Sequence, residues 1–190
     1  LLELGAGSWH HDHIFTIERK QFTKNGTGAG DEFANVLAGE TATVEFKARA
    51  LWSLDPPDPA RTTPLSPVQV KYGAKASRLI IARTLAAFLN TDGGHLVIGV
   101  LETKAAGQDD QIVGIERDYP YLEDRDTDGY QRMVIDSVLK PFLDSDFFPH
   151  FSQFITVDFK KVQGKTLCWI RVKRSDTPVF VIFAREEMFF

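Results

Sequence analysis

The alternation of apolar and polar positions predicts the central elements of this chain. Residues 77–89 are apolar at almost every position, which is typical of a buried helix. Residues 95–101 are apolar on both faces of an extended chain, the pattern of a central strand. In residues 43–48, Val44 and Phe46 alternate with polar neighbours, which predicts a strand with one buried face.

The remaining pattern completes an α+β arrangement. We expect an amphipathic helix over residues 128–143 and a short strand over residues 112–115. Three strands joined by hairpin-like turns are expected at 154–161, 167–173 and 178–184. The order β-α-β-β-α-β-β-β predicts a mixed β-sheet with helices packed on one side of it.

Two segments depart from this regular patterning. Residues 1–38 form an expected N-terminal extension with a strand, a Gly-rich linker and a short helix over residues 32–38, and residues 39–190 form the main domain. Prolines are concentrated between Pro56 and Pro67, so a loop insertion without regular structure is expected over 53–72. The chain begins at Leu and ends within a strand pattern, so we expect a fragment truncated at its C-terminus.

Composition narrows the functional classes. With 190 residues and 43% hydrophobic content, the chain can bury one full core. The single cysteine, Cys168, excludes an internal disulfide and a four-cysteine zinc site, and it fits a reducing cytoplasm, the expected location. No apolar run reaches the length of roughly 18 residues that a membrane span needs, so no membrane partner is expected.

Charge is unevenly distributed along the chain. The net charge of −4 argues against a dedicated nucleic-acid binder, since such domains are usually basic. Residues 159–174, however, carry six basic side chains and no acidic one. We interpret them as a candidate surface for RNA or DNA phosphates, and an ordinary solvated face is the alternative. They are Lys160, Lys161, Lys165, Arg171, Lys173 and Arg174.

Two carboxylates and a lysine surround the first predicted strand. Glu40 and Glu45 are an odd number of residues apart, so a regular strand would point them to opposite faces. Glu40 must therefore lie in a turn after Gly39 and point back toward Glu45. Carboxylates gathered around Mg²⁺ or Mn²⁺ can neutralise charge on a scissile phosphate, and Lys47 can hold a phosphate oxygen. The alternative is an exposed strand pair joined by salt bridges.

Five spaced motifs occur in the order found in Schlafen AlbA_2 domains, and over about residues 39–190 the chain resembles that family. The motifs are Gly39-Glu40-x4-Glu45-Phe46-Lys47, the helix end Ala87–Gly94, the strand Leu96–Val100, Ile112–Ile115, and Gly164-Lys165 followed by Ser175–Phe180. Members of this family are usually described as nucleic-acid-binding. The resemblance implies the fold of that domain and a nucleic-acid partner.

The resemblance also implies a catalytic set. Animal Schlafens cleave tRNA and rRNA with three acidic residues and a divalent metal. Two of these acids fall on Glu40 and Glu45, and the third falls on Glu102, where the animal enzymes have aspartate; Asp92 or Asp109 are alternatives for the third position. These three glutamates are thus the predicted catalytic residues and ligands of Mg²⁺ or Mn²⁺. The zinc ligands of the animal enzymes are missing, so no zinc is expected.

Two functional hypotheses follow. The first is a nucleic-acid-binding domain that acts as a metal-dependent endoribonuclease on structured RNA such as tRNA or rRNA. Because the animal enzymes pair two such lobes into a cradle, a single copy predicts a homodimer. The alternative is a non-catalytic DNA- or RNA-binding or regulatory domain of a larger protein, such as a transcriptional regulator or an ATPase-like protein. The net negative charge and the replacement of aspartate by Glu102 favour this alternative.

Overall fold

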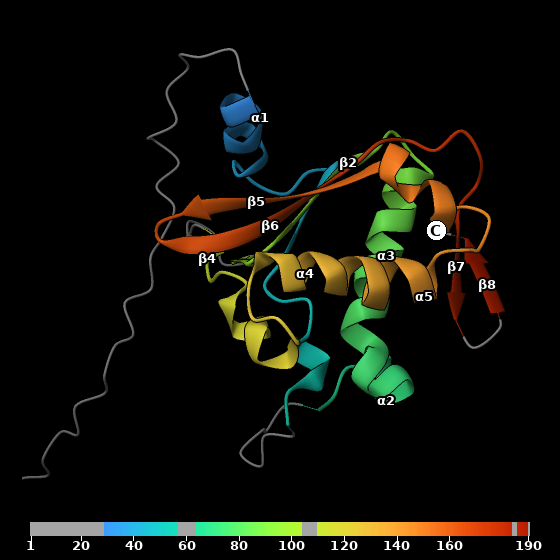
Figure 1. The fold of residues 1–190 in the computed structure, drawn as a ribbon, viewed down its shortest axis with the longest axis horizontal. Helices are drawn as coiled ribbons and strands as arrows, with labels where there is room; N and C mark the ends of the chain where they lie inside the picture. The colour runs from blue at the N-terminus through green and yellow to red at the C-terminus, as the bar shows by residue number, and fades with distance from the viewer. Residues whose placement is uncertain (1–28, 57–63, 104–109, 184–185, 190) are drawn as a thin grey trace, which may run out of the picture.

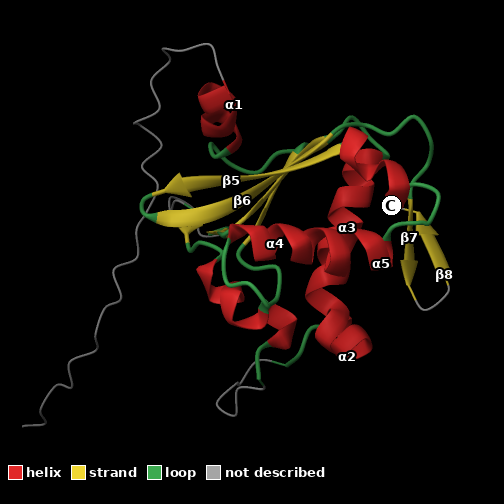
Figure 2. Ribbon diagram, in the orientation of Figure 1, coloured by secondary structure: helices red, strands yellow, loops and turns green. Residues whose placement is uncertain are grey.

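A four-stranded sheet lies at the centre of the chain, with helices on both of its faces (Figure 1 and Figure 2). The computed structural model describes residues 29–56, 64–103, 110–183 and 186–189. The strand order is β1-β2-β6-β5; β1 is parallel to β2, and the other two pairs are antiparallel. The predicted mixed sheet of an α+β fold is therefore confirmed. The strands are β1 (Val44–Lys47), β2 (Gly94–Ile98), β5 (Ile155–Val162) and β6 (Lys165–Val172).

The sheet buries a separate apolar cluster on each face, because successive side chains of a strand point to opposite sides. On one face, Leu96 belongs to the cluster that contains the buried side chains of α3 (Ala76–Leu89). On the other face, Val97 belongs to the cluster of Phe33 from α1 (Ala29–Val36). The expectation that all helices lie on one side is therefore wrong for α1, which covers the face opposite α3 (Figure 1).

The short helix expected over residues 32–38 is present as α1, which begins earlier, at Ala29, and ends at Val36. The strand and the Gly-rich linker expected before it lie outside the described residues. The buried helix expected over residues 77–89 is confirmed as α3, whose last turn ends at Asn90. The side chain of Asn90 then bonds both backbone groups of Val179, accepting from the N–H at 2.8 Å and donating to the C=O at 2.9 Å.

The expected amphipathic helix over residues 128–143 is a continuous run of three helical segments. They are α4 (Thr127–Met133), the π-helical segment η4 (Val134–Leu139) and α5 (Lys140–Phe142). The helix begins at Asp126, whose carboxylate accepts a hydrogen bond from the N–H of Gly129 at 2.8 Å. Together with α3, this run covers one face of the sheet (Figure 2).

The Pro-rich insertion is more ordered than expected. The short helices η1 (Trp52–Leu54), α2 (Pro67–Tyr72) and η2 (Gly73–Lys75) lie within or beside it. Pro67 occupies the first turn of α2, where a missing N–H costs nothing, and the Ser66 hydroxyl accepts the N–H of Gln69 at 3.2 Å. The expectation of an irregular loop is thus wrong for residues 67–72, while residues 57–63 lie outside the described part.

Two small ribbons pair outside the main sheet. The strand expected over residues 95–101 is divided at Gly99, which has φ 106°, into β2 and β3 (Val100–Leu101). β3 pairs with β4 (Gln111–Ile112), which is shorter than the strand expected at 112–115.

The last predicted strand does not join the meander. β7 (Phe180–Phe183) pairs instead with β8 (Glu186–Phe189), while β5 and β6 form the expected hairpin. The remaining elements of the described residues are two short helices, η3 (Glu116–Tyr121) and η5 (Phe148–Gln153). Within the described residues, no helix is both long and apolar enough to cross a membrane.

Candidate carboxylate site at the edge of the sheet

A tight reversal before β1 positions Glu40. Thr41 and Val44 exchange backbone hydrogen bonds of 3.0 and 3.3 Å, so the chain doubles back on itself over four residues. Glu40 consequently runs alongside β1 instead of preceding it, and its Oε1 accepts the backbone N–H of Phe46 at 2.6 Å. Gly39, with φ 139°, provides the left-handed backbone at the start of this reversal. Because of this turn, Glu40 lies beside β1 even though it is an odd number of residues from Glu45.

Glu45 and Lys47 point to the same side of β1, as two residues separated by one position must in a strand. Both side chains are partly exposed, whereas Val44 and Phe46 are buried in the cluster on the other face. The Lys47 ammonium pairs with the Glu45 carboxylate and also donates to the backbone oxygen of Phe46 at 3.0 Å. The ion pair is therefore local to β1.

The backbone of Phe46 faces away from the sheet. β1 is an edge strand, and its partner β2 uses the carbonyls of Thr43 and Lys47, at 2.7 and 2.8 Å from the N–H groups of His95 and Gly99. Phe46, one position out of phase with these residues, turns its N–H and C=O outward. Glu40 accepts the first and Lys47 donates to the second, so the candidate site residues also satisfy the open edge of β1.

Glu40 lies within electrostatic range of the other two predicted acids. The pKa of Glu40 is raised above its ordinary value, first by burial and then by the negative charges of Glu45 and Glu102; the Phe46 N–H and the positive charge of Lys47 partly oppose this. Glu102 reaches the site because it follows β3, which lies beside β1. Two separate parts of the chain therefore contribute negative charge around Glu40.

Of the two alternative third acids, only Asp92 lies within the described residues, and it is placed away from Glu102. Asp92 lies in the turn before β2, at the opposite end of that strand from Glu102, and its carboxylate is 3.9 Å from Arg174. Asp109 lies outside the described residues. The negative charge of Glu102, by contrast, raises the pKa of Glu40.

The donor chemistry of the site suits a hard divalent cation, because three carboxylates offer the oxygen ligands that Mg²⁺ and Mn²⁺ prefer. The positions of these side chains, however, do not form a metal site as they stand. Within the part of the chain that the structure describes, no group of three or more His, Cys, Asp or Glu side chains is placed to hold a metal ion. The carboxylates of Glu40 and Glu45 are already engaged, by the Phe46 N–H and by Lys47. A cation at this site would have to compete with Lys47 for Glu45.

A hollow of about 340 Å³ borders the site between β1 and α3. Glu45 and Lys47 line it on the β1 side, and Arg83 lies on the α3 side; the others are Ile80, Thr84 and Ala87. Arg83 was not singled out from the sequence, because α3 is apolar at almost every position. Its helical spacing was the available signal: residues 80, 83, 84 and 87 share one face, and Arg83 is exposed on it.

The candidate basic surface is divided by the structure. Arg171 lies over the ring of Trp169, 4.8 Å from its centroid, and its guanidinium pairs with Asp158 at 2.6 Å and with Glu32 of α1 at 4.0 Å. Lys160 also lies over Trp169, at 5.7 Å. These two cations therefore contact Trp169 on the face of the sheet that α1 covers.

The other four basic residues lie at the two ends of β6. Lys161 and Lys165 are exposed at the β5–β6 hairpin, whereas Lys173 and Arg174 are exposed just after β6. A strand of eight residues separates the two pairs by about 25 Å. The six residues therefore do not form one continuous surface, and the hydrogen bond of Glu40 and the ion pair of Glu45 are made within β1, with Phe46 and Lys47.

One protein family matches this chain. The family described as Schlafen, AlbA_2 matches residues 40–190. No curated protein matches the chain. Among solved structures, the crystal structure of the DIP2311 protein from Corynebacterium diphtheriae is similar, with a TM-score of 0.42 and 17% sequence identity over 84% of this chain. The matched region is 29% of the length of that protein.

Proposed function

Because the chain belongs to the Schlafen AlbA_2 family, whose domains generally bind nucleic acid, we propose that it binds RNA through the edge of β1 and cleaves it there in a metal-dependent reaction. The observation that carries this proposal is the placement of Glu40 alongside β1, where burial and the negative charges of Glu45 and Glu102 raise its pKa. Such crowding of carboxylates is common at sites that hold cations or transfer protons.

In this proposal the three glutamates hold one Mg²⁺ or Mn²⁺ ion. The bound ion supplies Lewis-acid stabilisation for the charge that develops on the phosphate and on the leaving oxygen. Lys47 exchanges its partner, moving from the Glu45 carboxylate to a non-bridging phosphate oxygen. Arg83, across the hollow from Lys47, contacts the same or the next phosphate. The hollow between β1 and α3 positions the backbone of the nucleic acid beside the carboxylates.

The second candidate function is a non-catalytic DNA- or RNA-binding or regulatory domain. The hydrogen bonds of Glu40 and Lys47 to the backbone of Phe46 favour it, because the open edge of β1 explains these two side chains without any reaction. In that case the carboxylates are structural, and nucleic acid is held by cations alone. Binding would then be retained in the absence of a divalent metal.

The deciding experiment is cleavage of labelled tRNA and of single-stranded DNA at about 50 mM salt, where phosphate contacts are strong, with Mn²⁺ or with a chelator. Glu45→Gln is the test variant, and Glu123→Gln, an exposed carboxylate before α4, is the matched control. Cleavage that needs Mn²⁺, persists in the control and is lost in Glu45→Gln supports the nuclease. Salt-sensitive binding without cleavage in any of the three proteins supports the non-catalytic domain.

We also propose that two copies of the domain assemble into a homodimer, so that two basic surfaces face one nucleic acid. The distance between the two pairs of cations at the ends of β6 favours this arrangement, since one copy presents no continuous basic track. Light scattering coupled to size-exclusion chromatography tests it. A mass near that of one chain, 21.4 kDa, at micromolar concentration and with RNA present would contradict the homodimer.

A further inference from the structure

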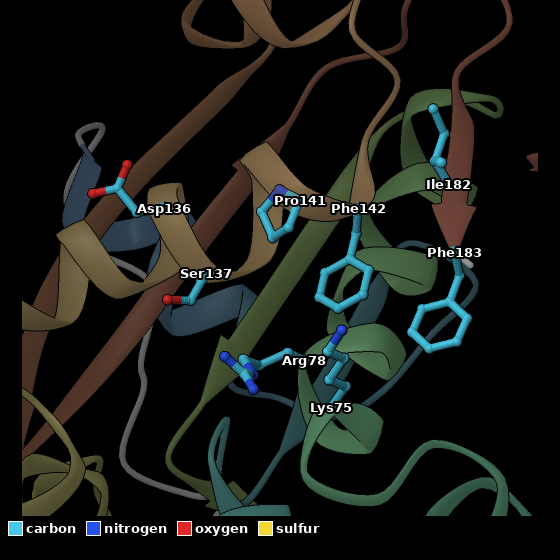
Figure 3. A pocket seen from close by; sticks show the side chains of 8 residues that line it. All are labelled: Lys75, Arg78, Asp136, Ser137, Pro141, Phe142, Ile182 and Phe183. Atoms are coloured by element: carbon cyan, nitrogen blue, oxygen red, sulfur yellow. The ribbon is translucent and has the colours of Figure 1, made fainter. Parts of the chain in front are cut away.

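A second hollow lies on the far side of α3 from the carboxylate site. Its volume is about 520 Å³, and it is bordered by η2 and α3, by the run from η4 to α5, and by β7 (Figure 3). Arg78 lines it, whereas Ala87 lines the hollow at β1. These residues are nine positions apart, or two and a half helical turns, so they project from opposite sides of α3. The two hollows are therefore separate.

Two cations line this second hollow, and one of them has an unused donor. The Nε atom of Arg78 is shielded from solvent and has no hydrogen-bond partner within the described structure, although the guanidinium donates to the Ala74 carbonyl at 3.3 Å. A buried donor without a partner costs free energy, and a bound acceptor would remove that cost. Lys75 is exposed, and its ammonium lies 5.9 Å from the centre of the Phe183 ring. Asp136 is the one acid that lines the hollow among the described residues.

The opposite part of the hollow is apolar. Pro141, Phe142, Ile182 and Phe183 line it, and the rings of Phe142 and Phe183 are nearly parallel, with an interplanar angle of 13°. Figure 3 shows the Arg78 guanidinium on the side of Ser137 and the Lys75 ammonium on the side of the two rings. The hollow thus combines two cationic side chains with an apolar wall.

We propose that this hollow binds a nucleoside monophosphate. Its phosphate is held by Arg78 and Lys75, with Ser137 as a further donor, and its base or sugar lies against Pro141, Ile182 and Phe183. Two positive charges lining one hollow suit a doubly charged phosphate better than a singly charged carboxylate. The volume lies within the range of about 300 to 1,000 Å³ of small-molecule sites and exceeds what phosphate alone would fill.

This assignment does not depend on the proposed nuclease. A phosphate monoester occurs both on a free nucleotide and at the 5′ end of a nucleic-acid strand, and the same chemistry recognises both. Calorimetric titrations with AMP, adenosine, inorganic phosphate and a 5′-phosphorylated tetranucleotide separate these sources. We expect AMP to bind more tightly than either adenosine or phosphate. Equal affinity for AMP and the tetranucleotide identifies a strand end as the ligand, and preference for AMP identifies a free nucleotide.

The variants are Arg78→Gln and Lys75→Gln, with Arg125→Gln, an exposed arginine outside the hollow, as the matched control. We expect the affinity for AMP to fall by about tenfold or more in Arg78→Gln and by about threefold to tenfold in Lys75→Gln, as the loss of a charge-assisted hydrogen bond implies. The control should be unchanged. Lys75 is exposed, so its variant remains informative if Arg78→Gln fails to fold.

Three results would overturn the proposal. The first is no binding of AMP to the unaltered chain at millimolar concentration. The second is AMP affinity that Lys75→Gln and a folded Arg78→Gln leave unchanged, since the nucleotide would then bind elsewhere. The third is adenosine binding as tight as that of AMP, which would remove the role of the two cations.

Discussion

The carboxylate of Glu40 accepts the outward backbone N–H of Phe46 at 2.6 Å, and this contact joins the stability of the sheet edge to the electrostatics of the candidate site. The same carboxylate is partly buried and lies near the negative charges of Glu45 and Glu102. One group thus completes a strand edge and belongs to a crowded anionic cluster. Its protonation is therefore expected to affect the stability of the fold.

The first prediction concerns this pH dependence. Because the folded-state pKa of Glu40 is raised, the folded chain holds its proton more tightly than the unfolded chain does. The free energy of unfolding should consequently decrease as pH rises from near the ordinary value of 4.5 through the higher folded pKa. Urea denaturation across this interval measures it. In Glu40→Gln the decrease should be smaller, and an identical pH profile would contradict the raised pKa.

The second prediction concerns a divalent ion. If the three carboxylates hold Mn²⁺, the ion binds the folded chain preferentially and stabilises it, by about 2.7 kcal/mol at a hundredfold excess over its dissociation constant. The melting temperature should rise with Mn²⁺ concentration in the unaltered chain and in the Glu123→Gln control. Glu45→Gln should show little or no increase. An equal increase in all three proteins would place the ion elsewhere.

The third prediction concerns Asp118, a fully buried carboxylate outside the candidate sites. It accepts hydrogen bonds from the N–H of Ala50 at 2.8 Å, from Arg49 Nε at 2.9 Å and from the Tyr130 hydroxyl at 3.2 Å. Asp118→Ala leaves the Arg49 charge without its buried partner, so we expect a loss of about 3 to 5 kcal/mol in the free energy of unfolding. Urea denaturation measures this loss. Exposed Glu123→Ala should change it by no more than about 0.5 kcal/mol.

The fourth prediction compares two glycines. A Cβ at Gly93, where φ is +83°, would lie 2.5 Å from the carbonyl oxygen of Val172, whereas a Cβ at Gly73, where φ is +52°, would meet nothing within 4 Å. Gly73→Ala should cost about 1 to 3 kcal/mol from backbone strain alone, because φ 52° with ψ −130° is rarely adopted by residues with a side chain. Gly93→Ala should cost clearly more, because the clash adds to the strain. Equal losses in thermal or urea denaturation would contradict the close approach of β6 to this turn.

The fifth prediction concerns the basic residues. Lys165→Gln, at the exposed hairpin, should weaken RNA binding and reduce the slope of log affinity against log salt by about 1, as expected for one phosphate contact. Arg171→Gln should instead mainly lower stability, because Arg171 is paired with Asp158 and lies over Trp169. Filter binding at several salt concentrations, together with denaturation, separates the two effects. An unchanged salt slope in Lys165→Gln would exclude the hairpin from the RNA surface.

Local patterns in the sequence determined the elements whose contacts are local. The continuous apolar positions of α3, the alternation in β1 and the turn between β5 and β6 each depend on neighbouring residues, and all three were predicted near their observed bounds. The motifs around Glu40, Glu45 and the end of α3 likewise identified the family. The reversal before Glu45 followed from spacing alone, since two side chains five positions apart cannot share a face of a regular strand.

Only the tertiary structure decided which distant segments meet. It placed α1 on the face opposite α3, separated β7 from the main sheet, let the charge of Glu102 act on Glu40, and put Arg83 across a hollow from Lys47. It also divided the basic residues, binding Arg171 to Trp169 and leaving Lys165 exposed. The physical reason is that periodicity specifies which side of an element is buried, whereas the partner that buries it is chosen by packing between residues far apart in the chain.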